Sequence, residues 1–214
     1  EQAETAAIKA HLLELGFPED VLRDLAEARS YERRIERIFL ADGDALILPM
    51  DYLLKVLDFI REYFPECTRV AAYATTKAIV RKTDEELRTL REHGLALVYI
   101  GLESGNEALL VKFNKGVTAA ETVENALRCK AAGIAISVTA INGMAGLNGN
   151  WQSHAIDTAK AVSAMKPEFI AFLTLRVYSG TPLHDWIEAG DFVMMEPADL
   201  MRETRLFLEH IDSE

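Results

Sequence analysis

Acidic and amide side chains follow several apolar runs of this chain, at positions where they could bind a ligand. The segment 38–46 (IFLADGDAL) is an apolar run that ends in Asp42-Gly43-Asp44, and three later runs end in the same way in Gly, Glu or Asn. Carboxylates at such positions accept hydrogen bonds from ligands or remove protons as general bases. Because α/β sheets bind ligands at their strand ends, these residues predict a site there.

Residues that bind metals are sparse by comparison. Cys67 and Cys129 are the only cysteines, and they lie far apart and outside any C-x-x-C spacing. The sequence therefore contains no self-contained zinc or iron-sulfur motif, and Cys129 is predicted to be a buried thiol within a helix. The five histidines are scattered without paired ligand spacing, which favours surface positions for all of them.

The apolar runs that must position the acidic residues predict strands. They begin near residues 35, 69, 96, 134 and 169, and they are short and rich in Val, Ile, Tyr and Phe. Between them, apolar residues recur at helical spacing over residues 52–64, 85–93, 121–132 and 156–165. The strands and helices therefore alternate, which is typical of βα units and predicts a parallel sheet.

Local signals mark the ends of two of these helices. Thr83-x-x-Glu86 and Thr118-x-x-Glu121 have the pattern of capping boxes, in which a hydroxyl and a carboxylate satisfy amide donors at the helix start. Gly94 and Gly133 follow these helices, where glycine tolerates a left-handed backbone. Strands that are apolar throughout are buried on both faces, so either a barrel ringed by helices or a doubly wound open sheet would fit.

Composition indicates one soluble domain. The 214 residues are half apolar, and the charge of 23 basic minus 34 acidic residues is -11. Such a charge disfavours a nucleic acid as a direct partner, since phosphate binding needs clustered Lys and Arg. The sequence shows neither a run of about 18 apolar residues nor the basic start and apolar core of a signal peptide. We therefore expect a cytoplasmic protein with no membrane partner.

The order of several short motifs resembles the core of the radical S-adenosylmethionine (SAM) proteins, or Fe-S oxidoreductases, from about Arg34 to Leu208. The motifs are ADGDAL, AYAT, YIGLESGN, NKGVT, SVTAINGMAG and YSGTPL. The resemblance implies a partial TIM-like (βα)6 barrel, open on one side, that carries SAM beside a [4Fe-4S] cluster. It divides the chain into an N-terminal helical segment at residues 1–33 and a barrel core at residues 34–214.

The chain departs from this family in one respect. Radical SAM enzymes hold their cluster with a C-x-x-x-C-x-x-C loop after the first strand, and this sequence has no such loop. We therefore predict a fragment that lacks the first strand and the cluster loop; the alternative is a natural cluster-free relative. This chain alone is not expected to bind the cluster or to perform radical chemistry. The strand at residues 35–40 would form an exposed edge, covered by a second molecule in a dimer or by helices at residues 5–15 and 18–28.

The resemblance also implies roles for individual residues. The turn at Asp42 to Asp44 corresponds to the family position that meets the amino group of the methionine part of SAM. Glu103 and Ser104 correspond to the position that contacts the ribose, and the segment 141–146 (INGMAG) to the motif that flanks the adenine. The predicted cofactor-binding residues are Asp42, Gly43, Asp44, Tyr73, Thr75, Glu103, Ser104, Asn142, Gly143 and Arg176.

Each of these residues also has a structural interpretation. Asp and Gly are common turn formers, and Ser104 could cap the short helix that follows it. Arg176, near the end of the last strand, could bind the SAM carboxylate or a substrate, or it could form a salt bridge. Tyr73 and Thr75 could line the cavity or pack against neighbours. The glycines after residue 142 could form a mobile loop.

For the full-length protein, the resemblance implies reductive cleavage of SAM and abstraction of a hydrogen atom from a substrate that the sequence does not identify. An electron would come from a reductant protein such as flavodoxin or ferredoxin. Two other classes stay open from the residues alone. A conventional parallel α/β lyase could use Asp44 or Glu103 as its base, and a non-catalytic scaffold could bind SAM or another nucleotide without turnover.

Overall fold

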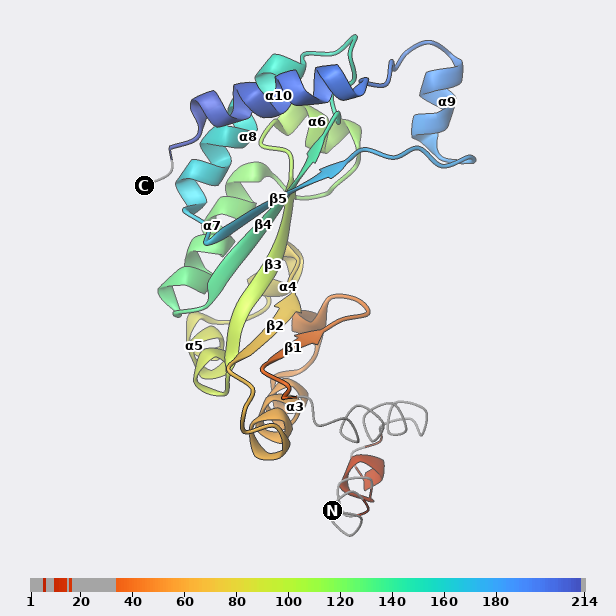
Figure 1. Ribbon diagram of the computed structural model, residues 1–214. Coiled ribbons are helices and arrows are strands. Elements are labelled where there is room, and N and C mark those ends of the chain that lie inside the picture. Colours follow the sequence, from red (N-terminus) through yellow and green to blue (C-terminus); the bar gives the residue numbers. More distant parts are fainter. Residues whose placement is uncertain (1–5, 7–9, 15, 17–33, 213–214) are drawn as a thin grey trace. The chain divides into compact units, whose positions relative to one another are not determined.

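The computed structural model describes residues 6, 10–14, 16 and 34–212 (Figure 1). The chain forms two compact units, Glu1–Glu36 and Arg37–Glu214. In the first unit, residues 6 and 10–14 are helical, in agreement with the helix predicted at residues 5–15. The helix predicted at residues 18–28 lies outside the described residues. The second unit holds the sheet and all the candidate site residues.

Five parallel strands form the sheet, and each strand lies beside the next one in the sequence, in the order β1-β2-β3-β4-β5. The strands are β1 (Arg37–Leu40), β2 (Arg69–Tyr73), β3 (Leu95–Glu103), β4 (Ala135–Asn142) and β5 (Phe169–Thr174). All four pairings are parallel, and the strand order does not reverse as it does in a doubly wound sheet, so the sheet is an open half-barrel, which confirms the predicted fold class. Within the described residues, β1 pairs only with β2 and is therefore an edge strand, as predicted.

The helices follow the predicted alternation, and helices α5 (Asp84–Glu92), α7 (Ala119–Ala131) and α8 (Trp151–Met165) lie along one face of the sheet (Figure 1). Both predicted capping boxes are present, at Thr83/Glu86 and at Thr118/Glu121. Gly94 and Gly133 have φ angles of 111° and 81° after these helices. The helical elements are η1 (Ala45–Ile47), α3 (Met50–Tyr63), α4 (Thr76–Val80), α5 (Asp84–Glu92), α6 (Glu107–Lys112), α7 (Ala119–Ala131), α8 (Trp151–Met165), α9 (Pro182–Glu188) and α10 (Pro197–His210).

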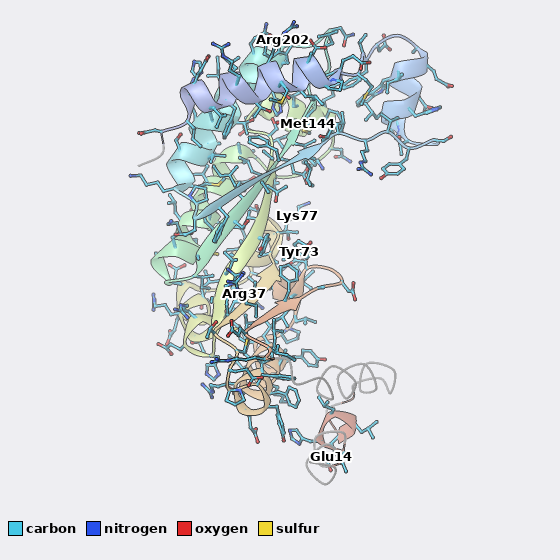
Figure 2. All side chains as sticks on the ribbon, viewed as in Figure 1. Glu14, Arg37, Tyr73, Lys77, Met144 and Arg202 are labelled. Carbon is cyan, nitrogen blue, oxygen red and sulfur yellow. The ribbon has the colours of Figure 1, made fainter. Side chains whose placement is uncertain are left out.

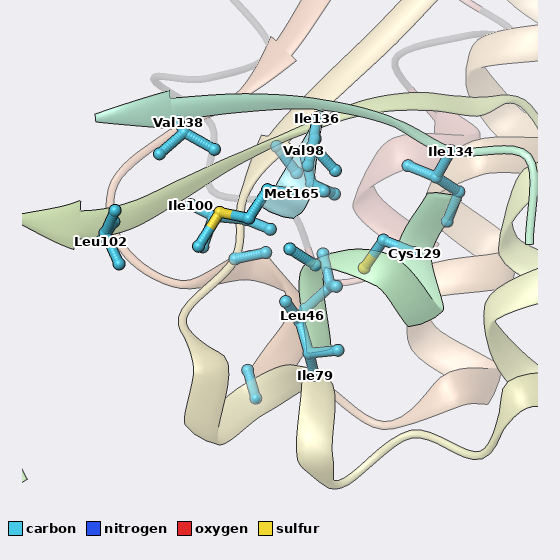
Figure 3. Packing of buried hydrophobic residues seen from close by; sticks show 14 of the residues in the cluster. Leu46, Ile79, Val98, Ile100, Leu102, Cys129, Ile134, Ile136, Val138 and Met165 are labelled. Atoms are coloured by element: carbon cyan, nitrogen blue, oxygen red, sulfur yellow. The ribbon is translucent and has the colours of Figure 1, made fainter. Parts of the chain in front are cut away.

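The hydrophobic core lies between the sheet and these helices. Val98, Ile100 and Leu102 alternate along β3 toward the helices, and Ile136 and Val138 do the same on β4 (Figure 3). Burial of each such side chain contributes about 1.5–3 kcal/mol, so the core stabilises the sheet from one side. The helix side chains that meet them include Cys129 on α7 and Met165 on α8, both with no exposed surface. The prediction of a buried thiol at residue 129 is thus confirmed.

The opposite face of β1 to β3 carries exposed aromatic residues. Phe39 is 39% exposed and Tyr73 is 50% exposed, and their ring centroids lie 4.8 Å apart in an edge-to-face arrangement. Tyr99 joins them, with its centroid 5.1 Å from that of Phe39. Tyr73 therefore packs against neighbouring rings while it also lines the open side of the sheet. Among the described residues, no helix has the length and apolar composition needed to cross a membrane.

Candidate functional site

The turn after β1 presents a carboxylate to the carboxyl end of the sheet. Asp42 and Gly43 have φ angles of 61° and 128°, and only glycine adopts the second value without strain. Oδ2 of the next residue, Asp44, accepts hydrogen bonds from the amide and the hydroxyl of Thr75, at 3.2 and 2.5 Å. Its Oδ1 is buried and has no hydrogen-bond partner within the part of the chain that the structure describes. A buried carboxylate oxygen without a donor is suited to a cationic or hydrogen-bonding ligand.

A lysine from α4's C-terminal side supports this turn. Lys82 is 7% exposed, and its Nζ donates a hydrogen bond of 2.6 Å to the carbonyl oxygen of Leu48. Leu48 is the residue after η1, which directly follows Asp44. A charged ammonium group is buried at a cost unless it is hydrogen-bonded, so this contact fixes the end of the turn to the helical layer.

Glu103 ends β3 in a backbone conformation that is rare for a non-glycine residue. Its φ angle is 62°, and the amide of Ser104 donates a hydrogen bond of 2.7 Å to the carbonyl oxygen of Leu102, which closes a three-residue turn around it. The pairing of β3 with β4 also shifts register between Gly101 and Glu103. Such strain costs about 1–3 kcal/mol and is concentrated at functional sites.

The carboxylate of Glu103 lies in a cavity of about 220 Å³ between the start of α4, the end of β3 and α6. Its Oε2 forms an ion pair with Nζ of Lys115. Its Oε1 lies over Gly101, where a Cβ atom added to the glycine would be 3.5 Å away, an ordinary van der Waals distance. Thr75 and Lys77 line the same cavity, and Figure 2 shows Lys77 near the end of β2. Thr75 thus connects the Asp44 turn to the Glu103 cavity.

The end of β4 is occupied differently. The side-chain amide of Asn142 donates to Oγ1 of Thr204 at 2.7 Å, and the backbone amide of Gly143 donates to Oε2 of Glu203 at 2.7 Å. Both acceptors belong to α10. Two of the predicted cofactor-binding residues therefore donate their hydrogen bonds to a helix rather than toward the cavity.

The glycine-rich segment after β4, which the sequence suggested as a mobile loop, is packed in its first part and exposed at residues 147–150. Residues 143–146 are buried, and a side chain at Gly146 would lie 3.0 Å from the ring of Phe192. The amide of Leu147 also donates to the carbonyl oxygen of Val193 at 2.7 Å. Figure 2 shows Met144 beneath α10 and Arg202 on the outer side of that helix. The segment after α9 thus covers these glycines, a contact between residues far apart in the sequence.

Ser104 faces α8 rather than the cavity. It is fully buried, and its Oγ lies 2.8 Å from Nδ1 of His154. His154 is 3% exposed, so the prediction that every histidine lies on the surface is wrong for this residue. Burial lowers the pKa of His154. The helical spacing of small residues could have predicted this burial, because His154 shares the buried face of α8 with Ala155, Thr158 and Ala159.

Glu203 is a second buried polar residue that sequence reasoning missed. It is 2% exposed, and burial raises its pKa to about 7. It shares the inward face of α10 with Phe207, four residues later, so an acidic residue within an apolar helical stripe was the available signal.

The remaining predicted residue, Arg176, lies two residues after β5 and is exposed. The structure thus brings Asp44, Thr75 and Glu103 together, with Lys115 as an unpredicted cation. It turns Ser104, Asn142 and Gly143 toward α8 and α10.

The comparisons identify the class of protein that this half-barrel and its strand-end site define. A family model of the radical SAM superfamily matches residues 13–159. The chain belongs to the radical SAM superfamily, which confirms the resemblance inferred from its motifs. Membership implies SAM and a [4Fe-4S] cluster as cofactors. A search of curated proteins found no match.

Solved structures share the fold at low sequence identity. Coproporphyrinogen III oxidase (HemN) from Escherichia coli is 15% identical with a TM-score of 0.61, over 83% of this chain and 41% of that one. Elp3 from Methanocaldococcus infernus is 14% identical with a TM-score of 0.63, over 89% and 47%. Methylornithine synthase (PylB) is 14% identical with a TM-score of 0.58, over 85% and 50%. The chain therefore spans at most half the length of these three proteins.

The residues of the chain fit the two implied cofactors unequally. Cluster ligands are thiolates, whereas burial raises the pKa of Cys129 to about 12 and keeps its thiol protonated. Cys67 directs its sulfur to the carbonyl oxygen of Arg69 at 3.6 Å. These two cysteines do not fit a cluster site. SAM fits better, because a buried acceptor on Asp44 and a carboxylate on Glu103 suit its ammonium and hydroxyl groups.

Proposed function

We propose that this chain forms the SAM-binding part of a radical SAM enzyme and holds SAM along the ends of β1, β2 and β3. The observation that carries the proposal is the strained Glu103, whose carboxylate lies in a cavity beside the turn of Asp44, where Oδ1 has no partner among the described residues. A strained backbone conformation persists only where the surrounding structure holds it, and such residues cluster at functional sites. The cavity of about 220 Å³ is smaller than a typical small-molecule pocket, so it accommodates only part of SAM.

Each group has a defined role in this proposal. Oδ1 of Asp44 accepts a hydrogen bond from the SAM ammonium group, and Gly43 allows the backbone to approach closely. Glu103 accepts hydrogen bonds from the ribose hydroxyls, as acidic residues do in dinucleotide sites. Lys115 pairs with Glu103 and holds its carboxylate in place. Asp42, Tyr73 and Thr75 shape the surrounding wall.

The cluster and the substrate belong to the complete protein in this proposal. The cluster supplies the electron that cleaves SAM, and the residues of this chain bind and orient SAM and exclude water from it. The complete enzyme would abstract a hydrogen atom from a substrate that is not identified, with electrons from a flavodoxin or a ferredoxin. A cytoplasmic location and a dimer through the β1 edge remain predictions.

Binding of SAM to this chain, measured by isothermal titration calorimetry, tests the proposal. We expect Asp44→Asn and Glu103→Gln each to weaken binding by about tenfold or more, because each loses a charge-assisted hydrogen bond. Glu124→Gln is the matched control, since it removes the same charge from a position on α7 outside the cavity. Equal affinity in all four proteins, or no binding by the wild type, would contradict the proposal.

A further inference from the structure

Three buried polar side chains connect the ends of β3 and β4. Ser104 follows β3, His154 lies on α8, and Glu203 lies on α10; each is at most 3% exposed. We call them the Ser104–His154–Glu203 network. Buried polar groups are costly unless they are satisfied, so such a network specifies one arrangement of the elements that supply it.

The contacts of His154 fix the position of its proton. Its Nε2 lies 3.1 Å from the carbonyl oxygen of Ile141, which can only accept, so Nε2 carries the proton. Nδ1 is then an acceptor, and the hydroxyl of Ser104 donates to it at 2.8 Å. Oγ of Ser104 in turn accepts from the amide of Asn106 at 2.9 Å. A neutral His154 thus connects the turn after Glu103 to a carbonyl group near the end of β4.

Glu203 holds the next residue of the β4 end. Its Oε2 accepts from the amide of Gly143 at 2.7 Å, and its Oε1 is buried without a hydrogen-bond partner in the described residues. Oε1 lies 3.7 Å from Nε2 of His154. Two titratable groups lie near Glu203 or its neighbours. One is His154, and the other is Asp157, whose negative charge on the same helix favours the protonated form of His154. The loop after β4 contributes only the amide of Gly143.

We propose that His154 and Glu203 are positioning residues for SAM, which hold the Glu103 turn and the end of β4 in the geometry that binds it. The inference rests on the proposed function, because Glu103 directly precedes Ser104 and moves with it. It extends that function by assigning a positioning role to two residues outside the cavity and a pH-sensitive one to Glu203. Ionisation of Glu203 places a charge in a buried site where the nearest basic group is the neutral His154. The cost of desolvating this charge outweighs the stronger hydrogen bond from Gly143, so ionisation favours separation of α10 from the β4 end.

The test compares the wild type with Glu203→Gln, which keeps the size of the side chain and an acceptor for Gly143 but does not ionise. SAM affinity is measured by calorimetry between about pH 6 and about pH 8.5, on either side of the pKa range of Glu203. We expect wild-type affinity to fall at least about fivefold over this range relative to Glu203→Gln. Glu209→Gln, an exposed residue on the same helix, should keep the wild-type profile.

Amide exchange of Gly143, measured by NMR, is a readout independent of SAM. After correction for the intrinsic rate, its protection should fall with rising pH in the wild type and stay constant in Glu203→Gln. Identical protection profiles, or identical SAM profiles in proteins that bind SAM, would overturn the positioning inference alone. A wild type that does not bind SAM at any pH would overturn both this inference and the proposed function.

Discussion

The ends of β1 to β3 and the end of β4 lie on the same edge of one sheet, yet they use their polar groups in opposite ways. At the first, Asp44 keeps a buried carboxylate oxygen without a donor in the described part of the chain, and Glu103 is strained toward a cavity. At the second, Asn142 and Gly143 are hydrogen-bonded to α10. We call these the open end and the closed end of the site.

This difference assigns ligand binding to the open end and structural support to the closed end. An unpaired acceptor and a strained backbone cost stability, and they persist where a ligand later uses them. At the closed end, Oε1 of Glu203 has no hydrogen-bond partner among the described residues, but the other polar groups named there are paired, and these paired groups contribute rigidity instead. The closed end therefore acts as the fixed base against which the open end binds its ligand.

The largest expected effect concerns packing at the closed end. Gly146→Ala places a methyl group 3.0 Å from the ring of Phe192 at a φ angle of 71°. Strain and overpacking together should lower the unfolding free energy by about 3–4 kcal/mol. Gly190→Ala is the matched control, because its φ of 81° is similar but no atom of the described residues lies within 4 Å of the added carbon. Urea denaturation measures both, and equal losses would show that the closed end is not tightly packed.

A second prediction concerns the pH dependence of stability. Burial raises the pKa of Glu203 from 4.5 to about 7. The protonated carboxyl group therefore contributes its full share of the unfolding free energy below about pH 4.5, and this contribution is lost as pH rises through about 7. The loss should amount to roughly 2–3 kcal/mol. Burial lowers the pKa of His154, so its contribution is instead complete above pH 6.5 and is lost as pH falls through the lowered pKa.

Urea unfolding of the wild type and of Glu203→Gln between about pH 5 and about pH 8 isolates the contribution of Glu203. The difference between the two curves should follow the ionisation of this one carboxyl group. A difference that does not change with pH would mean that Glu203 is already ionised at the low end of the range, as an exposed residue would be.

The fold was largely predictable, because it depends on local patterns. The alternation of apolar runs and amphipathic segments, and the capping boxes at Thr83 and Thr118, give the order of strands and helices. The choice between a half-barrel and a doubly wound sheet was not local, since it depends on which strands become neighbours. It required the motif order in the sequence and the pairing in the structure.

The site was predictable only at the open end. Asp44, Thr75 and Glu103 lie at or shortly after the ends of their strands, so a parallel sheet brings them to one edge. Glu203 meets Gly143 across 60 positions of sequence, through a helix whose placement no short motif indicates. The same holds for Ser104 and His154, 50 positions apart. Sequence reasoning therefore found strand-end residues and missed the side chains on α8 and α10 that bind their polar groups.

The smallest expected effect tests whether the open end has support of its own. Lys82 fixes the turn after Asp44 through its hydrogen bond to Leu48, and Lys82→Met keeps the length of the side chain while it removes that donor. We expect a loss of about 1 kcal/mol in unfolding free energy and a roughly threefold weaker affinity for SAM, since the turn gains freedom that binding must remove. Lys160→Met, at an exposed position on α8, controls for the lost charge. If Lys82→Met binds SAM as tightly as this control, the open end holds its geometry through Thr75 and the strand itself, and support from the helical layer is confined to the closed end.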